Sequence, residues 1–534
     1  MMSLSIVVVA LALCAFALVT TVEAYRRWNK TSNPWGFPGP GLVPYIGRIH
    51  DLPPECFWLK LKEWADKYGG IYKTQMIGWN FVVISDESIA EELFVKRSKK
   101  YSDRPIVPSL IDSKSNHGML SYLPLMGRNE AWARQRKWAH SFLMQAAATQ
   151  YKGIMDFEYK HLLFILLGDP DNFSFHIENA NSKIMCTLAY DDPSPSPEMR
   201  LSAWNLLRQM SPNGPLTNLV TPLWRLPLLL NPWKRSEYVR RGIQQTFWMD
   251  LLNGAREKWQ AGQLRPCWAR QYLDLGEKSP LQGDFEAHSA IGMLALVGVY
   301  TVGGPAQYFL TAMITHPEWM AKCQEEIDRE CEGRPPTLSD YRNLPVLRAC
   351  IKETMRWRSP VPAGVAHELE ADDYYRGGFI SKGTRVLPLD WAMMRNETKY
   401  PDAENYHPER FLEPEWPTYK EPLTEFPTIK GMSSFGWGIR TCLGQTLTQD
   451  ALIVLCGGLL WAFNAKHKTH PVTGANIPIS LKTSSEVITK PLPFEMVFEP
   501  RSEERKAAII SNWLEAEAKD TKERQDFLSA AASH

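Results

Sequence analysis

Apolar residues recur at helical spacing through most of the chain, and this pattern predicts a protein built mainly of helices. Two stretches differ, because residues 71–85 read as two strands around Gly78 and residues 363–390 alternate like short strands. We therefore expect a mainly α fold with a small β region. The helical pattern is clearest in residues 55–68, 86–97, 130–147, 150–168, 173–190, 197–210, 284–315, 343–357 and 445–463.

The N-terminal apolar run predicts a membrane anchor. Residues 4–22 carry no charge and are about as long as a helix that crosses a bilayer core of roughly 30 Å. Arg26, Arg27 and Lys30 follow at once, and such a basic flank places the rest of the chain on the cytoplasmic side. No convincing cleavage site follows the run, so we interpret residues 1–25 as a retained transmembrane anchor.

The remaining chain divides into a linker, one large domain and a tail. Residues 26–50 are basic and rich in proline, which stiffens a linker. Residues 51–500 carry the helical and strand patterns of a single large domain. Residues 501–534 are charged and helix-prone, and the sequence leaves open whether this tail packs on the domain.

Composition excludes several classes of function. The 534 residues carry a formal net charge of only +1, so nothing suggests a nucleic-acid partner. The nine cysteines are odd in number and form no C-x-x-C pair, which argues against a disulfide framework or a zinc site and favours a reducing compartment.

One Gly-rich stretch, residues 434–444, carries the candidate chemistry. Gly436 and Gly438 let the backbone turn sharply and lie close to a flat ligand. Cys442 stands at or next to the start of the apolar helix that follows, where free N–H groups favour a thiolate over a thiol. Arg440 offers forked donors to a carboxylate. This combination fits a haem-iron ligand with an arginine on a haem propionate.

The stretch matches the signature F-x-x-G-x-R-x-C-x-G at Phe435, Gly438, Arg440, Cys442 and Gly444. At this point the sequence resembles the cytochrome P450 family of haem-thiolate monooxygenases. A structural cysteine in a Gly-rich turn is the alternative, and five matched positions disfavour it. The resemblance implies haem b as cofactor, held by Cys442 on the iron and contacted by the rest of this loop, including Gly436.

Two further matches imply contacts to the haem propionates. Trp132 and Arg136 lie four residues apart on one predicted helix face and resemble the W-x-x-x-R of the family. His367 matches a propionate-contacting position of the family. The alternatives are a surface arginine beside a core tryptophan and a histidine that only packs. Residues 102–105 resemble the S-x-R-P step that leads into the variable loop over the haem.

A third match implies a buried ionic network. Glu353 and Arg356 form an E-x-x-R on one face of the predicted helix 343–357, and Arg410 stands in P-E-R-F. By resemblance, these three residues hold the core on the haem side. Each motif alone is weak, but their order before the cysteine loop is specific.

The long run 284–315 resembles the oxygen-binding helix of the family but departs from it at one position. Gly298 and Thr301 match the pattern [AG]-G-x-[DE]-T, whereas Tyr300 stands where Asp or Glu is expected. The threonine and the acid help to deliver protons in the family, and a phenol with a pKa of about 10 does this poorly. The alternative is that Tyr300 faces away from the haem and packs. Pro305, which follows Gly303 and Gly304, predicts a kink or local opening at Thr301.

The resemblance implies the P450 fold and a membrane-bound monooxygenase. We expect an enzyme that oxidises a hydrophobic small molecule of secondary metabolism with O2 and with electrons from NADPH through NADPH-cytochrome P450 reductase, with cytochrome b5 as a further candidate partner. The anchor implies a single-pass protein of the endoplasmic reticulum membrane whose catalytic domain faces the cytoplasm. The apolar, Pro-broken residues 219–233 match the roof of the substrate channel, which often touches membrane lipid, and simple packing is the alternative.

Three other activities stay open from the sequence. The first uses the same haem chemistry for cyclisation, desaturation or phenol coupling without oxygen insertion, and Tyr300 makes it more plausible. The second is a reductase-independent isomerase or dehydratase, against which the retained Thr301 counts. The third is a haem-binding protein without catalysis, against which the intact cysteine loop argues.

Overall fold

The structure is a computed structural model that describes residues 14, 17–18, 21–22, 36–43, 46–110, 120–149, 151–211, 214–215, 218 and 220–532. The predicted anchor, residues 1–25, lies almost wholly outside these residues and stays a prediction. Side chains 144–149, 221–222 and 531–532 are likewise outside the description.

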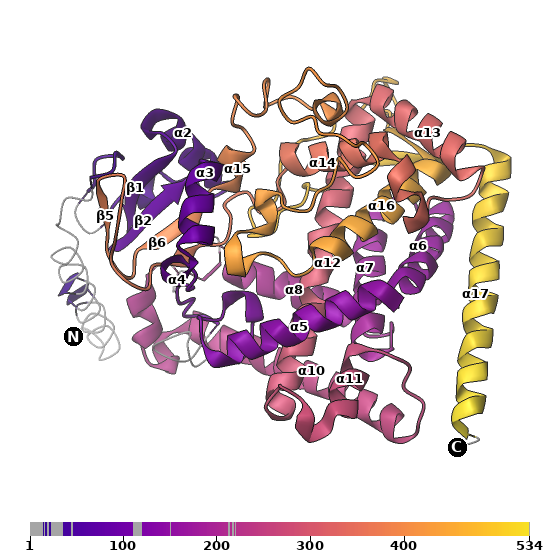
Figure 1. Cartoon of the computed structure of the whole chain (residues 1–534), viewed down its shortest axis with the longest axis horizontal. Helices are drawn as coiled ribbons and strands as arrows, with labels where there is room; N and C mark the ends of the chain where they lie inside the picture. Colours follow the sequence, from indigo (N-terminus) through magenta and orange to yellow (C-terminus); the bar gives the residue numbers. More distant parts are fainter. Residues whose placement is uncertain are drawn as a thin grey trace, which may run out of the picture.

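Helices form most of the described chain, and the predicted helical segments are present within a few residues of their expected bounds (Figure 1). The α-helices are α2 (Trp58–Tyr68), α3 (Glu87–Ala90), α4 (Ser98–Tyr101), α5 (Glu130–Thr149), α6 (Tyr151–Gly168), α7 (Phe173–Tyr190), α8 (Ser196–Met210), α10 (Pro232–Gln260), α11 (Trp268–Leu275), α12 (Gly283–Thr315), α13 (Pro317–Cys331), α14 (Pro345–Trp357), α15 (Asp390–Met393), α16 (Gln445–Ala462) and α17 (Glu503–Ala532).

Short turns of other helical types connect these elements. They are η1 (Ile49–Asp51), the π-helical η2 (Glu91–Lys96), η4 (Leu123–Leu125), η5 (Thr221–Arg225), η6 (Leu228–Leu230), η7 (Gly276–Lys278), η8 (Leu338–Asn343), η9 (Pro408–Phe411), η10 (Ser433–Phe435) and η11 (Gly438–Arg440).

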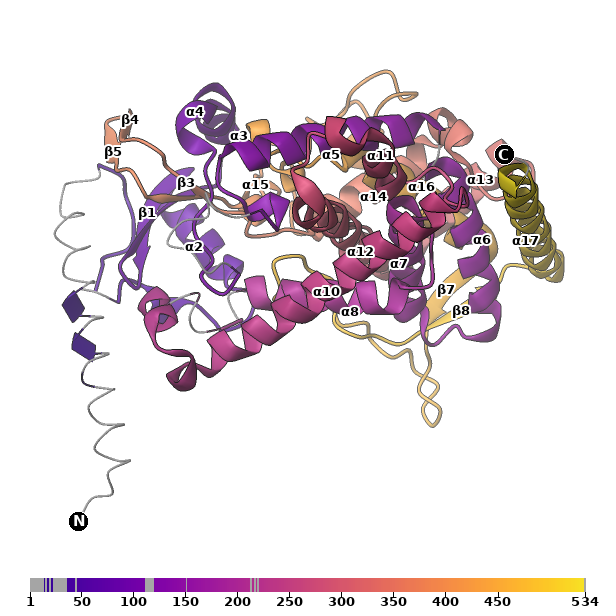
Figure 2. The same ribbon diagram turned by 90° about the horizontal axis from the view of Figure 1, so that it is seen from below.

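Most of the β region gathers at one side of the molecule, on the left of Figure 1. Its main sheet has the order β1 (Ile71–Met76), β2 (Trp79–Ile84), β6 (Arg385–Pro388), β3 (His367–Glu368), in which only β2 and β6 run parallel. This sheet therefore joins residues 71–84 to residues 367–388. Two small antiparallel pairs are β4 (Asp373–Tyr375) with β5 (Gly378–Ile380) and β7 (Phe463–His467) with β8 (Met496–Pro500). The β7–β8 pair lies at the other side of the molecule, near α6 (Figure 2).

Helix α12 runs through the centre of the helical body (Figure 2) and packs against α7, α8, α10, α14 and α16. Among the described residues it is the one helix long and apolar enough to span a membrane, but 89% of its most apolar window is buried inside the protein. Its apolarity therefore reflects a core position. The helix continues without a break through Pro305, so the local opening predicted at Thr301 is wrong, while a kink there stays a prediction. Packing on several sides holds the helix across the missing N–H of the proline.

The C-terminal tail forms α17, which lies along α6 at the right edge of Figure 1. Trp513 is the main contact, since its ring stacks on His161 at 4.2 Å and approaches Phe157 at 5.2 Å. The structure thus decides the question that the sequence left open, and the tail packs on the domain.

Candidate active site

A large cavity lies between α12 and the loop that carries Cys442, and it encloses about 1880 Å³ of empty space together with its opening. Most of its lining is aliphatic. The principal apolar lining residues are Leu123, Leu125, Leu206, Leu207, Met210, Met293, Leu294, Val297, Val361, Val365, Val487 and Ile488. None of the described lining residues is Asp or Glu. Such a cavity suits a hydrophobic molecule.

Cys442 lines this cavity and lies three residues before the first residue of α16. Its thiol accepts a hydrogen bond from the N–H of Gly444 at 3.3 Å, and its own N–H donates to the carbonyl of Phe435 at 2.7 Å. Burial nevertheless raises the pKa of the thiol, more than the Gly444 N–H and Arg136 lower it. The N–H of Gly444, next to the start of α16, favours the thiolate as the sequence predicted, and desolvation acts against it.

The glycines of the loop allow close packing within the protein as well as room for a ligand. Gly438 has a positive φ of 55°, and a Cβ there would lie 2.2 Å from the carbonyl oxygen of Phe94 in η2. Gly438 thus lets the loop pack onto η2. This reason for a glycine at position 438 differs from the close approach of a ligand that the sequence predicted. Phe435, Gly436 and Gly444 all line the cavity.

Arg440 and Arg136 meet at the edge of the cavity, around the ring of Trp132. The Arg440 guanidinium lies 4.1 Å from the Trp132 ring centre, and that of Arg136 lies 5.8 Å from it. Arg136 donates to the carbonyl of Thr441 at 2.5 Å, and the Nε of Arg440 donates to the carbonyl of Ser102 at 2.7 Å. The two motifs that the sequence paired with the propionates thus come together in space.

His367 joins the same edge from the start of β3. Its Nδ1 donates a hydrogen bond to the carbonyl of Tyr101 at 2.7 Å, and its Nε2 takes no part in that bond. Burial, and then the charge of Arg104, hold the pKa of His367 well below its usual range. The ring is therefore neutral with these neighbours alone.

Arg104 is a residue of this site that the sequence interpretation did not assign. Its guanidinium donates to the carbonyls of Pro124, Val365 and Ala366 at 3.1, 2.9 and 2.8 Å. Arg104 thereby ties two cavity-lining segments to the basic edge. The S-x-R-P match could have indicated this arginine, but its carbonyl partners lie 20 and more than 260 residues away in the sequence.

The basic edge has the character of an anion site. Burial and the nearby Arg104 lower the pKa of Arg440 to about 8, and burial and Arg136 lower that of Arg104 to about 9. Within the described part of the chain, neither Nη atom of Arg440 has a hydrogen-bond partner, although both are buried. Buried donors without acceptors and crowded cations are costly. A ligand that carries carboxylates would satisfy both, so these residues fit haem with its propionates at this edge and Cys442 below its iron.

The opposite wall carries the predicted residues of α12. The hydroxyl of Thr301 donates to the carbonyl of Val297 at 2.7 Å, one turn earlier, and Thr301 lines the cavity. A Cβ on Gly298 would lie 2.5 Å from the sulfur of Met185, so the missing side chain lets α7 pack closely against α12. Tyr300 borders the cavity, but its hydroxyl donates to the carbonyl of Arg200 in α8 at 3.3 Å. This contact agrees with the alternative in which Tyr300 packs.

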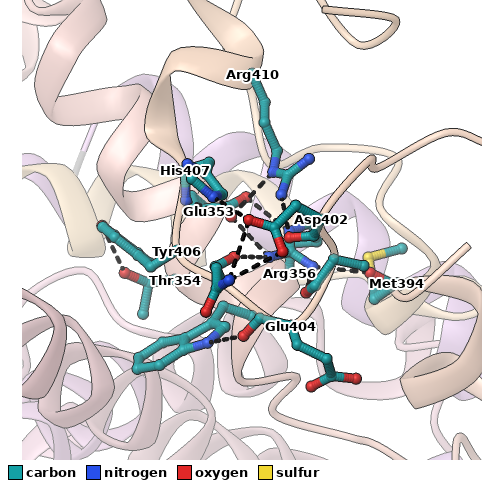
Figure 3. Close-up of polar contacts among 12 residues, drawn as sticks. Glu353, Thr354, Arg356, Met394, Asp402, Glu404, Tyr406, His407 and Arg410 are labelled. Atoms are coloured by element: carbon teal, nitrogen blue, oxygen red, sulfur yellow. Dashed lines mark hydrogen bonds and ion pairs between the residues drawn. The ribbon is translucent and has the colours of Figure 1, made fainter. Parts of the chain in front are cut away.

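The predicted ionic network forms at the C-terminal half of α14 (Figure 3). Both carboxylate oxygens of Glu353 accept from Arg356 at 2.7 Å, and one of them also accepts from Arg410 at 3.3 Å. All three side chains are fully buried. The remaining arginine donors reach the carbonyls of Met394, Pro401, Asp402, Ala403 and Asn405. The network therefore fixes the segment that leads from α15 to the cysteine loop.

Comparisons with known proteins agree with this arrangement. A family model described as Cytochrome P450 matches residues 37–498. The chain is 31% identical to the cytochrome P450 monooxygenase virE of Hypocrea virens, over 93% of this chain and 92% of that protein. It is 30% identical to the cytochrome P450 monooxygenase verL of Clonostachys rogersoniana, over 90% of each. It is 29% identical to the cytochrome P450 monooxygenase fogE of Aspergillus ruber, over 89% of each. Helix α17 lies beyond the family match.

Proposed function

Because the chain belongs to the cytochrome P450 family, we propose that it is a haem-thiolate monooxygenase that oxidises an apolar small molecule of fungal secondary metabolism, using O2 and electrons from NADPH. The observation that carries the proposal is the opening of Cys442 into an apolar cavity whose edge holds the unpaired donors of Arg440. Family membership makes the protein an oxidoreductase of monooxygenase type, while the substrate is part of the proposal.

The residues of this chain divide the work by position. Haem, when bound, supplies the redox chemistry at iron, and a thiolate ligand favours cleavage of the O–O bond. Arg440, Arg136 and His367 hold the propionate edge, and a carboxylate beside Nε2 of His367 would favour its protonated form. The aliphatic lining excludes water and orients an apolar substrate. The Thr301 hydroxyl holds a proton on the substrate side of α12.

A spectrum and a mass difference test this function. The reduced, CO-treated protein should show the thiolate-type carbonyl band, and Cys442→Ala should lose it because alanine cannot ligate iron. A variant that kept the band would contradict the ligand assignment. Comparison of metabolites from cells with and without the gene should then show a product heavier than its precursor by one oxygen atom.

One observation favours a second candidate, oxidation that removes hydrogen without inserting oxygen. No carboxylate lies among the described lining residues, and the Tyr300 hydroxyl points to α8, so the usual acid of the family is missing from the cavity. A product that has lost two hydrogens, or a precursor dimer less two hydrogens, would establish cyclisation, desaturation or coupling in place of oxygen insertion.

We also propose that the protein is held in the endoplasmic reticulum membrane and receives electrons from NADPH-cytochrome P450 reductase, with cytochrome b5 as a further donor. The apolar run 4–22 with its basic flank supports the location. Membrane contact by the domain itself is supported by the exposed apolar side chains of Leu229 in η6, which is 93% exposed, and of Trp233 at the start of α10. Removal of residues 1–35 should weaken membrane association without abolishing it, and full release into the soluble fraction would exclude contact through η6.

A further inference from the structure

A hairpin after α16 forms part of the cavity wall. Residues 483–491 are closed by a bridge between Thr483 and Pro491, and the N–H of Ser484 donates to the carbonyl of Lys490 at 2.9 Å. Val487 and Ile488 at the tip of this hairpin line the cavity. The position of the tip therefore sets part of the space that a substrate can occupy.

Hydrogen bonds attach the hairpin to several neighbours. The N–H of Cys56 donates to the hydroxyl of Ser485 at 3.2 Å, and the hydroxyls of Tyr308 and Thr483 are also hydrogen-bonded to each other. The N–H of Val487 donates to the hydroxyl of Ser211, just after α8, at 3.0 Å. The N–H of Thr489 donates to the carbonyl of Pro360 at 2.9 Å, and its hydroxyl donates to the carbonyl of Ser359 at 3.0 Å. Each such bond between neutral groups is modest, on the order of 1 kcal/mol.

The charged attachment is the ion pair between Lys490 and Glu178. Glu178 projects from α7, its side chain is only 2% exposed, and its carboxylate accepts from the Lys490 ammonium. It also accepts from Arg200 and Gln307, each at 3.2 Å. The Lys490 ammonium lies 4.9 Å from the ring centre of Trp204. Because the Glu178 carboxylate is buried, moving Lys490 away would leave it with less compensating charge, which is costly.

Helix α12 is shaped to receive this arrangement. A Cβ on Gly304 would lie 2.7 Å from the carbonyl oxygen of Thr489, so only glycine lets the hairpin backbone approach the helix here. A Cβ on Gly303 would lie 3.5 Å from the side chain of Glu178. Gly304 thus makes room for the hairpin backbone, whereas a Cβ on Gly303 would meet Glu178 at an ordinary contact distance.

We propose that the Glu178–Lys490 ion pair determines specificity by holding the hairpin against α12, and so sets how far Val487 and Ile488 project into the cavity. Both charged residues lie outside the cavity lining and act as positioning residues. The proposal rests on the proposed function, since the cavity is taken as the substrate site. Loss of the pair should change the fit of large molecules while leaving small ones unaffected.

The test compares Lys490→Met, which keeps the aliphatic stem, with Lys490→Arg, which restores the charge. Lys466→Met is the matched control, because Lys466 forms an ion pair with Glu499 on the exposed face of β7 and β8. The full-length, haem-loaded protein is titrated with imidazole and with clotrimazole, followed by the shift of the haem absorption. Hydrogen exchange of residues 484–490 and the Tm are measured on the same samples.

Lys490→Met should shift the Kd of clotrimazole by about tenfold, the scale of a methylene misfit in an apolar pocket, and leave that of imidazole unchanged. Exchange of residues 484–490 should rise about tenfold, as for loss of one hydrogen bond to a charged group. Lys490→Arg should restore both values, and Lys466→Met should change neither. A lower Tm with wild-type Kd values and exchange would show a structural role only and overturn the proposal.

Ser211→Ala serves where Lys490→Met does not fold, because it removes the Val487 attachment and, besides that, only the hydrogen bond from the Ser211 hydroxyl to the carbonyl of Leu207. It should shift the clotrimazole Kd in the same direction by a smaller factor, and an unchanged Kd overturns the role of the hairpin tip. Failure of the proposed function has a separate signature. The wild-type protein would then bind no haem, whereas hydrogen exchange would still report whether Lys490 holds the hairpin.

Discussion

At the scale of single residues, Arg440 combines burial, crowding by like charge and unmet hydrogen bonds. Its Nε is satisfied by Ser102, but its two Nη atoms face the cavity edge with no acceptor among the described residues. Burial and Arg104 lower its pKa to about 8, which measures how poorly the site tolerates the charge without a counterion. An anion at this edge would remove the penalty.

Arg440→Leu should weaken haem retention. A hydrogen bond to a charged group contributes about 1.5–3 kcal/mol, so the rate of haem dissociation should rise about tenfold or more. Transfer of haem to apomyoglobin measures this rate. Arg329→Leu removes an exposed arginine of α13 and should retain haem as the wild type does. Equal rates for Arg440→Leu and wild type would exclude a propionate contact.

Asp390 is a second informative residue, since it is a buried carboxyl held by two hydroxyls. Ser359 and Ser433 donate to its two oxygens, and Ser433 lies in the stretch that leads to Cys442. Burial raises its pKa from 3.8 to about 6, which Glu87 reinforces and Arg395 opposes. Asp390 therefore links the end of α14 to the cysteine loop at the cost of a desolvated charge.

This pKa predicts a pH dependence of stability. Between about pH 4 and pH 6 the folded protein binds the Asp390 proton more tightly than the unfolded chain, so the free energy of unfolding falls as pH rises through this window. The total fall corresponds to about 1.4 kcal/mol per unit of pKa shift. Urea denaturation at several pH values measures it. In Asp390→Asn the free energy of unfolding should change less between about pH 4 and pH 6 than in the wild type. If the two proteins lost the same free energy over this range, the raised pKa would be contradicted.

At the scale of elements, α12 and α17 show how packing decides what local sequence leaves open. Helix α12 stays continuous across Pro305 because neighbouring elements hold it on several sides. Helix α17 packs through the buried Ile509 and through Trp513, whose ring lies among Phe157, His161 and Phe164 of α6. The docking of this helix, which lies beyond the family match, should therefore depend on that tryptophan.

Trp513→Ala should lower the free energy of unfolding by about 3–5 kcal/mol, the usual cost of removing a buried tryptophan. The neighbouring Leu514→Ala is the control, because this leucine is more than half exposed and should change stability by about 0.5 kcal/mol or less. Chemical denaturation of both variants measures the difference. Similar midpoints for the two would show that α17 does not contribute its packing to the fold.

At the scale of the whole molecule, one buried network joins segments that lie far apart in the sequence. Glu353 of α14 holds Arg356 and Arg410, and these arginines hold the backbone of residues 394–405 (Figure 3). This backbone leads to the cysteine loop. The geometry at Cys442 is therefore coupled to the stability of the segments that the network joins.

Glu353→Gln should cost about 3–5 kcal/mol, because it leaves two buried guanidinium groups without a counterion. The variant should also convert the thiolate-type carbonyl spectrum to the inactive form at lower denaturant concentration than the wild type. Glu63→Gln, in an exposed pair on α2, should cost about 1 kcal/mol or less. If both variants matched the wild type, the network would not support the cysteine loop.

The sequence alone was sufficient for features that depend on local spacing. Periodicity predicted the helices and the small β region, because one face of each element must be apolar to pack. The cysteine signature, E-x-x-R and P-E-R-F indicated the family, because their chemistry needs those residue types in that order. The roles of Thr301, His367 and the other site residues stay predictions.

Only the tertiary structure decided properties that depend on neighbours distant in the sequence. Desolvation opposes the effect of the helix start on the Cys442 pKa, and α12 continues through Pro305. The carbonyl partners of Arg104 and the approach of Thr489 to Gly304 come from segments far along the chain. Burial and close contact arise only when those segments meet, so no local pattern could have shown them.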